Sequence, residues 1–400
     1  MTEVQKVIGL MSGTSLDGVD AALLETDGQD IVSPGPALTI AYDKATRALL
    51  RAALEEARNV AAGAPVPQSI REAERHLTQA HAGAVEALLD KAGLEAGAAG
   101  LIGFHGQTIL HRPQRHWTWQ IGDGALLARL TGIDVINDFR GADVKAGGQG
   151  APLMPLYHAV LVRQFRSGSP FGAKPREGGG AGPKRQRMDG PGVSEGERGS
   201  PAVVVVNIGG VAQVTYIKGD GIFAFDTGPG NAPIDDWMHS HTGRPVDEDG
   251  AFAATGKVNE AALDAMLDNP FFARLPPKSL DRMDFGMAAV KDLSPADGAA
   301  TLTAFTAASL ARAREHFPEP AASWIVSGGG RHNKTLMAML KARVNAPVLT
   351  AEDVGWDGDG LEAQGFAYLA MRAKLGLPLS LPTTTGVAQP MTGGRYYRKP

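Results

Sequence analysis

The sequence predicts an α/β protein of two lobes with a cleft between them. An apolar strand, a glycine-rich turn and a second strand begin the chain, and the same order recurs after residue 200. Helices follow each time, which is typical of packed α/β layers. The third observation is size, because 400 residues suffice for roughly two to three average domains with a sizeable core.

The first half of the chain alternates short apolar runs with helical periodicity. Residues 4–10 form an apolar run, and MSGTSLDG follows it as a turn rich in glycine, serine and threonine. In the region 69–92, Leu77, His81, Val85 and Leu88 recur three or four positions apart, which predicts a one-faced helix. The expected elements are strands at 4–10, 19–28, 101–104 and 133–136 and helices near 45–60, 69–92 and 123–131.

The second half repeats this order. Residues 203–206 are an apolar, β-branched run that ends in the glycine turn NIGG. A helix near 300–317 places Leu302, Phe305, Ala313 and Phe317 on one face. The expected elements are strands at 203–206, 211–217, 221–226 and 323–327 and helices near 231–241, 260–268, 300–317, 333–344 and 361–374.

The segment from about 165 to 200 interrupts the pattern. It consists of glycine, proline, serine and charged residues with almost nothing to bury, so we expect a disordered insertion. A basic docking loop around Lys184, Arg185 and Arg187 is the functional alternative to a tolerated surface insertion.

Composition excludes several classes of protein. The chain has 39 Lys and Arg against 43 Asp and Glu, a balance that argues against wrapping nucleic acid or lying on an anionic membrane. It has no cysteine, which excludes disulfides, cysteine-bound metals and thiol nucleophiles. Its start does not resemble a secretory signal and no apolar run is long enough for a membrane span, so we expect a cytoplasmic protein.

Four glycine-rich turns follow apolar strands, at 13–18, 207–210, 226–231 and 327–330. Glycine lets backbone N–H groups approach phosphate oxygens, and serine or threonine adds hydroxyl donors. Each turn taken alone can equally be a simple hairpin closure. None of them is a Walker A motif or a dinucleotide fingerprint. Together they are compatible with a nucleotide phosphate chain held between two lobes.

Carboxylates accompany these turns. Asp17 and Asp20 lie in or beside the first turn, and Asp226 ends the apolar run IFAF. A carboxylate at a strand end facing a cleft is a common position for a general base. The alternative for Asp226 is a side chain that caps its own turn.

Two further segments carry polar side chains. GFHGQTILHRP holds His105, Gln107, Thr108 and His111, donors suited to a hydroxyl-rich ligand, and its glycine-containing, strand-like context excludes a zinc helix. Downstream, Arg140 begins a glycine-broken loop and either binds a carboxylate through two hydrogen bonds or forms an ion pair with Asp138 or Asp143.

Eight ordered motifs together resemble the anhydro-N-acetylmuramic acid kinase family. They are MSGTSLDGVDAAL, GFHGQTILHRP, QIGDGALLA, DFRGADVKAGGQGAPL, VVNIGGVAQVT, FDTGPGN, VSGGGRHN and LPTTTGVAQP. The resemblance covers nearly the whole chain except the segment 165–200. Two positions differ from the family pattern, since Lys145 and Gln213 stand where the family commonly has alanine and asparagine.

The resemblance implies the two-lobed sugar kinase/Hsp70/actin-like fold, related to ribonuclease H, with ATP between the lobes. It implies conversion of 1,6-anhydro-N-acetylmuramate, ATP and water to N-acetylmuramate 6-phosphate and ADP in peptidoglycan recycling. Mg²⁺ would accompany ATP, and the sequence does not identify its ligands. The small-molecule sugar would be the partner, with no nucleic acid or membrane, and a homodimer stays open.

The resemblance also assigns residues. Asp226 is the expected general base, and Glu362 lies where the family has a substrate-side glutamate, although a glutamate opening a helix can also complement the helix dipole. The expected ATP-binding residues are Gly13, Thr14, Ser15, Leu16, Asp17, Gly18, Val19, Asp20, Asn207, Gly209, Gly210, Gly328 and Gly329. The expected sugar-binding residues are His105, Gln107, Thr108, Gln120 and Arg140.

The resemblance divides the chain into an N-terminal lobe at 1–140 and a C-terminal lobe at 141–375, with the tail from about 376 to 400 expected to pack on the first. A conventional sugar kinase is the nearest alternative, in which Asp226 would deprotonate a free hydroxyl. A sugar-sensing regulator or a chaperone ATPase is disfavoured, because no helix-turn-helix segment or peptide-binding domain is left to assign.

Overall fold

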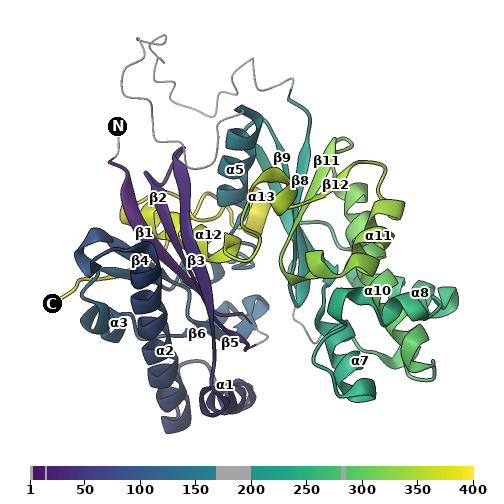
Figure 1. Ribbon diagram of the computed structural model, residues 1–400, viewed down its shortest axis with the longest axis horizontal. Helices are drawn as coiled ribbons and strands as arrows, with labels where there is room; N and C mark the ends of the chain where they lie inside the picture. The colour runs from purple at the N-terminus through teal and green to yellow at the C-terminus, as the bar shows by residue number, and fades with distance from the viewer. Residues whose placement is uncertain (1–2, 14–15, 168–199, 281–284) are drawn as a thin grey trace.

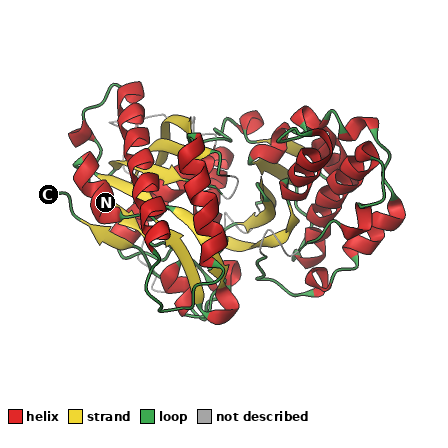
Figure 2. Cartoon of the chain, turned by 90° about the horizontal axis from the view of Figure 1, so that it is seen from below, coloured by secondary structure: helices red, strands yellow, loops and turns green. Residues whose placement is uncertain are grey.

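The protein has two lobes, each built on one β-sheet. The computed structural model describes residues 3–13, 16–167, 200–280 and 285–400. The lobes lie side by side along the long axis, as Figures 1 and 2 show, with strands toward the interior of each lobe and most helices outside. The two-lobed α/β fold predicted from the sequence is confirmed.

The first sheet has the strand order β13-β7-β4-β1-β2-β3. Strands β1, β2 and β3 are antiparallel, β4 and β7 continue parallel to β1, and β13 pairs antiparallel with β7. The strands are β1 (Gln5–Met11), β2 (Gly18–Thr26), β3 (Val32–Ala41), β4 (Leu101–Phe104), β7 (Val135–Asn137) and β13 (Arg395–Tyr397).

The second sheet has the order β10-β9-β8-β11-β12. Its first three strands are antiparallel and the next two run parallel to β8, so it repeats the order and directions of β3-β2-β1-β4-β7 in the first sheet. The strands are β8 (Val203–Ile208), β9 (Val211–Lys218), β10 (Gly221–Pro229), β11 (Ser323–Ser327) and β12 (Val348–Thr350). This repeat is the structural basis of the recurrence seen in the sequence.

Helices cover both sheets. In the N-terminal half they are α1 (Lys44–Ala57), α2 (Gln68–Ala92), α3 (Gly124–Thr131), α4 (Gly141–Lys145) and α5 (Pro155–Ser167). In the C-terminal half they are α7 (Ala232–Thr242), α8 (Glu260–Leu267), α9 (Pro270–Ala273), α10 (Pro295–Arg312), α11 (Lys334–Arg343), α12 (Leu361–Lys374) and α13 (Pro382–Thr385). A small hairpin of β5 (Gln107–Arg112) and β6 (Trp117–Ile121) stands beside the first sheet.

Alternating residues of β1 separate two cores. Ile8 packs with the buried faces of α1 and α2, whereas Val7 faces a core that contains residues of α5 and α12. The second core also includes Val203 and Val205 of β8, so it runs from one lobe into the other. Figure 1 shows α5 and α12 between the two sheets. These two helices therefore join the lobes.

Helix α12 approaches the first sheet very closely. A β-carbon at Gly9 of β1 would overlap the carbonyl oxygen of Ala363, and one at Gly103 of β4 would overlap that of Phe366. Glycine at these two positions lets the helix backbone rest on the strands. Helix α12 lies inside the range expected for the C-terminal lobe, yet it packs on β1, β2 and β4.

Some elements were not predicted from the sequence. Strand β3 begins V-S-P-G-P, a pattern that argues against a strand, but β3 is an edge strand, where proline is tolerated. Helix α5 extends to Ser167, so the expected insertion cannot begin at 165. Residues 168–199, on which the rest of that expectation falls, lie outside the described residues.

Candidate active site

Three polar residues of the second sheet lie side by side at its cleft end. Gln213 of β9 is paired in register with Asn207 of β8 on one side and with Asp226 of β10 on the other. Directly opposed residues of antiparallel strands project from the same face. A β-bulge between Asp226 and Gly228 shifts the register, and the pairing then continues to Pro229. The antiparallel register therefore gathers this polar row on one face.

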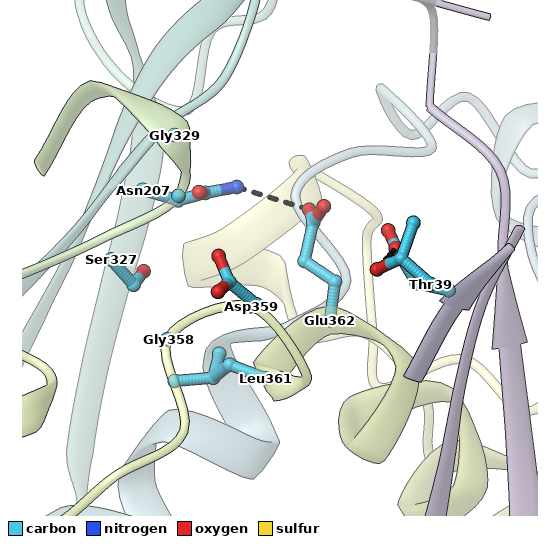
Figure 3. A pocket seen from close by; sticks show the side chains of 10 residues that line it. Thr39, Asn207, Ser327, Gly329, Gly358, Asp359, Leu361 and Glu362 are labelled. Carbon is cyan, nitrogen blue, oxygen red and sulfur yellow. Dashed lines mark hydrogen bonds between the residues drawn. The ribbon is translucent and has the colours of Figure 1, made fainter. Parts of the chain in front are cut away.

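A cavity lies between the lobes next to this row. Strands β2 and β3 of the first sheet form one side of the cavity, and three segments of the second lobe form the other side. The first residues of α12 close it, as Figure 3 shows. The lining residues are Asp20, Thr39, Asn207, Ser327, Gly328, Gly329, Gly358, Asp359, Leu361 and Glu362. Five of the residues expected to bind ATP or to act in catalysis thus meet here: Asp20, Asn207, Gly328, Gly329 and Glu362.

Glu362 lines this cavity and contacts the opposite lobe. Its Oε1 accepts a hydrogen bond of 3.0 Å from Asn207 Nδ2, the dashed line in Figure 3. Burial and the negative charge of Asp20 raise the pKa of Glu362, against the opposing effect of Arg140. Burial likewise raises the pKa of Asp20, and the nearby Asp359 adds to that rise. The cavity therefore concentrates carboxylates that repel one another.

Asp226 lies deep in the second lobe and only 4% of its surface is exposed. Its Oδ2 accepts a hydrogen bond of 3.0 Å from the Leu280 amide, while its Oδ1 is buried without a hydrogen-bond partner among the described residues. Burial raises the pKa of Asp226 to about 7, although the Leu280 amide and the Arg140 charge oppose this. A carboxylate with such a pKa can take up a proton near neutral pH.

Arg140 brings a positive charge to both carboxylates. Its charge lowers the pKa of Asp226 and of Glu362, and their charges raise its own pKa against the larger effect of burial. The guanidinium donates to His105 Nε2 at 3.1 Å and to the Gly150 carbonyl at 2.6 Å. Neither of the ion pairs considered from the sequence, with Asp138 or Asp143, is among its hydrogen bonds.

His105 is held in one neutral form. Because its Nε2 accepts from Arg140, its Nδ1 carries the proton and donates to the Gly106 carbonyl at 2.8 Å. Burial and the adjacent Arg140 charge hold the pKa of His105 well below its usual range. His105 therefore orients the guanidinium and does not compete with Asp226 for a proton.

The loop that accepts from Arg140 is fixed by the C-terminal tail. Asp143 is buried, and its Oδ1 accepts from the Gly150 amide at 2.6 Å. Its Oδ2 accepts from Thr385 at 2.6 Å and from Ser380. One carboxylate thus ties the tail motif LPTTT to the loop that ends in Gly150, a link that the spacing in the sequence could not reveal.

The hairpin β5–β6 carries the remaining residues expected to bind sugar. Thr108 and Gln120 are paired across it, and Gln120 Nε2 donates to Thr108 Oγ1 at 3.2 Å. Gln107 is fully buried and accepts from Ser12 at 2.6 Å, next to the first glycine turn. Gln107 thus bonds to Ser12 at the end of the first strand, and Thr108 and Gln120 are the half-buried members of the group.

Arg331 holds the glycine turn at 328–330. Its side chain is only 3% exposed, and it donates to the Gly328 carbonyl at 3.0 Å, to Glu352 at 2.9 Å and to Asp359 at 2.8 Å. Gly328 has φ +76°, and a β-carbon there would collide with the Asn207 side chain. Arg331 and Asp359 were not predicted from the sequence, although the motifs GGGRHN and GWDGDG that contain them were the available signal.

Not every residue expected to bind ATP is part of the cavity. The side chains of Leu16 and Val19 belong to the core of the first lobe, which leaves only their backbone to a ligand. Gly13, Asp17, Gly18, Gly209 and Gly210 do not line the cavity. Thr14 and Ser15 lie outside the described residues.

The described ranges contain neither a cluster of metal-binding side chains nor a membrane-spanning helix. No group of three or more histidine, aspartate or glutamate side chains there is arranged to hold a metal ion. In the same ranges, no helix combines the length and apolar character that crossing a membrane requires.

Two lobes with the same strand order, glycine turns and carboxylates that face one cleft define a protein of the sugar kinase/Hsp70/actin-like class. The model of the family described as anhydro-N-acetylmuramic acid kinase matches residues 5–169 and 197–399. The chain belongs to this family. The match leaves out 170–196, most of the segment that interrupts the sequence pattern.

Three curated relatives match nearly the full length of the chain. A protein of Rhizorhabdus wittichii named anhydro-N-acetylmuramic acid kinase is 50% identical over 393 residues, which are 98% of each chain. A protein of Rhodospirillum rubrum with the same name is 48% identical over 395 residues, 98% of this chain and 93% of its own. A third, from Methylobacterium nodulans, is 48% identical over 400 residues, 97% of this chain and 98% of its own.

Proposed function

We propose that this chain is an ATP-dependent kinase that opens 1,6-anhydro-N-acetylmuramate with water and phosphorylates its O6. Water attacks C1, the C1–O6 bond breaks, and O6 forms a bond to the γ-phosphorus of ATP as the bond to ADP breaks. The proton lost by water passes to Asp226 and then to solvent. The products are N-acetylmuramate 6-phosphate and ADP, as cytoplasmic recycling of peptidoglycan requires.

The observation that carries this proposal is the Asp226 carboxylate. A base for water needs a free lone pair and a pKa near the working pH. Asp226 Oδ1 is buried with no hydrogen-bond partner among the described residues, and burial raises the pKa of the carboxyl to about 7. The charge of Arg140 favours the ionised form of Asp226, and we expect the same guanidinium to bind the lactyl carboxylate of the sugar.

We assign the binding of ATP to the residues that line the cavity. Backbone amides of the turn 328–330, held by Arg331, would contact the phosphates, and Asn207 would orient them from β8. Phosphoryl transfer depends mainly on such positioning and on neutralising charge.

The carboxylates of the cavity fit Mg²⁺. The negative charge of Asp20 raises the pKa of Glu362, and that of Asp359 raises the pKa of Asp20, so the cavity is an environment in which a divalent cation would relieve repulsion between carboxylates. Mg²⁺ usually takes one or two protein carboxylates together with phosphates and water, so a site without three protein ligands is compatible with it. When bound, the ion would neutralise phosphate charge.

Comparison of two sugars tests this function. Purified protein is incubated with ATP and either 1,6-anhydro-N-acetylmuramate or open N-acetylmuramate, and ADP release is measured. The proposal predicts turnover of the anhydro sugar and little of the open one. Preferential turnover of the open sugar would make the chain a conventional sugar kinase, in which Asp226 deprotonates the 6-hydroxyl.

A further inference from the structure

Residues 278–280 form a short segment that binds Asp226 through two backbone hydrogen bonds. The Asp226 amide donates to the Lys278 carbonyl at 2.9 Å, and the Leu280 amide donates to Asp226 Oδ2 at 3.0 Å. The segment thus contacts the aspartate through backbone groups on both sides. Its position decides where the carboxylate lies and how well its charge is stabilised.

Lys278 anchors this segment by an unusual arrangement. Its side chain is 6% exposed, and its ammonium donates to the carbonyls of Phe271 and Phe272 at 3.1 and 3.4 Å. The ammonium also lies 4.6 Å from the centre of the Phe271 ring. Both phenylalanines belong to the core of the second lobe, so the lysine fastens the segment to a rigid base.

This arrangement is costly for a lysine. Among the described residues, no carboxylate forms an ion pair with Lys278. Burial and, to a smaller extent, the cations Arg312 and Arg274 lower the pKa of Lys278 to about 8, against the opposing effect of Glu315. A methionine would fill a similar volume without that cost, so the charge and its donors call for a functional explanation.

We propose that Lys278 is a positioning residue of the reaction: it holds residues 278–280 on helix α9 so that the Leu280 amide stays on the Asp226 carboxylate. This inference rests on the proposed function, in which Asp226 is the base. Lys278 acts only through the backbone and touches no reacting atom.

The same segment connects the base to the sugar side of the cleft. Ser279 Oγ donates to Gln149 Oε1 at 2.8 Å. Gln149 adjoins Gly150, whose carbonyl accepts from Arg140. Lys278 therefore fixes a segment that contacts both the base and the loop that holds the arginine.

The test compares Lys278→Met, which keeps the alkyl stem but loses the donors, with Lys278→Arg, which keeps them. Exposed Lys291→Met is the matched control. For Lys278→Met we expect kcat about tenfold lower with KM for both substrates unchanged, since misplacing a reacting group lowers the rate of the chemical step. The acidic limb of the kcat profile should move to higher pH, because a weaker Leu280 bond raises the pKa of Asp226. Lys278→Arg should restore much of the rate, and Lys291→Met should behave as wild type.

A folded Lys278→Met variant with the kcat and pH profile of the wild type would overturn the inference. If that variant does not fold, Lys278→Gln, which loses the charge and shortens the side chain, takes its place, with a several-fold lower kcat and a displaced pH limb expected, and wild-type behaviour would again overturn the inference. Turnover by the wild type reports on the proposed function, whereas the difference between variant and wild type reports on Lys278.

Discussion

The amide of Asn207, on the second sheet, donates a 3.0 Å hydrogen bond to the carboxylate of Glu362, in the first turn of the helix that packs on the first sheet. This bond joins the two lobes at the floor of the cleft. It also leaves the other oxygen of Glu362 to act toward a ligand, next to the charges of Asp20 and Arg140. This oxygen of Glu362 is therefore available to a cation or to a metal-bound phosphate that enters the cavity.

Replacement of Glu362 by glutamine tests this role. Glu362→Gln keeps an oxygen for Asn207 but removes the charge, so we expect the Mg²⁺ concentration for half-maximal activity to rise about tenfold, about 1.4 kcal/mol. Glu260→Gln is the control, because Glu260 also lies in the first turn of a helix but is exposed. An unchanged Mg²⁺ dependence in Glu362→Gln would mean that Glu362 does not bind the cation and only complements the dipole of its helix.

Asp226→Asn should abolish most of the activity while keeping shape and hydrogen bonding. Loss of a general base typically lowers kcat by about 10²–10⁴-fold, or roughly 3–5.5 kcal/mol. Binding of ATP and sugar, measured by calorimetry, should change much less, since the interaction is lost mainly in the transition state. The exposed Asp264→Asn serves as control. Near-normal turnover in Asp226→Asn would move the base elsewhere, with Glu362 the first candidate.

The raised pKa of Asp226 makes both rate and stability depend on pH. The base works when ionised, so the rate should fall as pH falls through about 7. The unfolded aspartate has a pKa near 3.8, so the folded protein binds this proton more tightly, and the group costs stability as pH rises from about 4 to 7. The melting temperature of Asp226→Asn relative to wild type should therefore be higher at pH 8 than at pH 5. An advantage that is equal at both values would contradict the raised pKa.

The sequence predicted the sheets better than the contacts between them. Apolar runs such as Val203–Val206 and the helical spacing of Leu77 and Val85 are local signals, and the structure confirms the strand and helix they predicted. Strand β3 was not predicted because its prolines are tolerated only in an edge strand, and whether a strand lies at an edge depends on the whole sheet.

The site shows the same division. The motifs singled out Asp226, Arg140 and Asn207, but not the supports of Asp226 and Arg140. The Leu280 amide, the Lys278 anchor and the link from Asp143 to Thr385 join segments 54, 7 and 242 residues apart. The first and last of these contacts have no periodicity in the sequence, since they follow from how sheets and loops pack.

Gly328→Ala should weaken nucleotide binding. Gly328 has φ +76°, and a β-carbon would displace Asn207, so we expect Kd for ATP to rise at least about tenfold. Gly355→Ala is a close control, because Gly355 has φ +77° with nothing within 4 Å of the added carbon. The control carries similar backbone strain and should keep its affinity for ATP. Equal losses in the two variants would show that strain, and not the turn at 328–330, is responsible.

Labelled water tests the hydrolytic kinase account most directly. The reaction is run in ¹⁸O water with ATP and 1,6-anhydro-N-acetylmuramate, and the product is analysed by mass spectrometry before its anomeric oxygen exchanges with solvent. The account predicts one solvent oxygen at C1 and none in the phosphoryl group, because water attacks the sugar while O6 receives the phosphorus. Product without the label at C1, or with the label in the phosphoryl group, would contradict it.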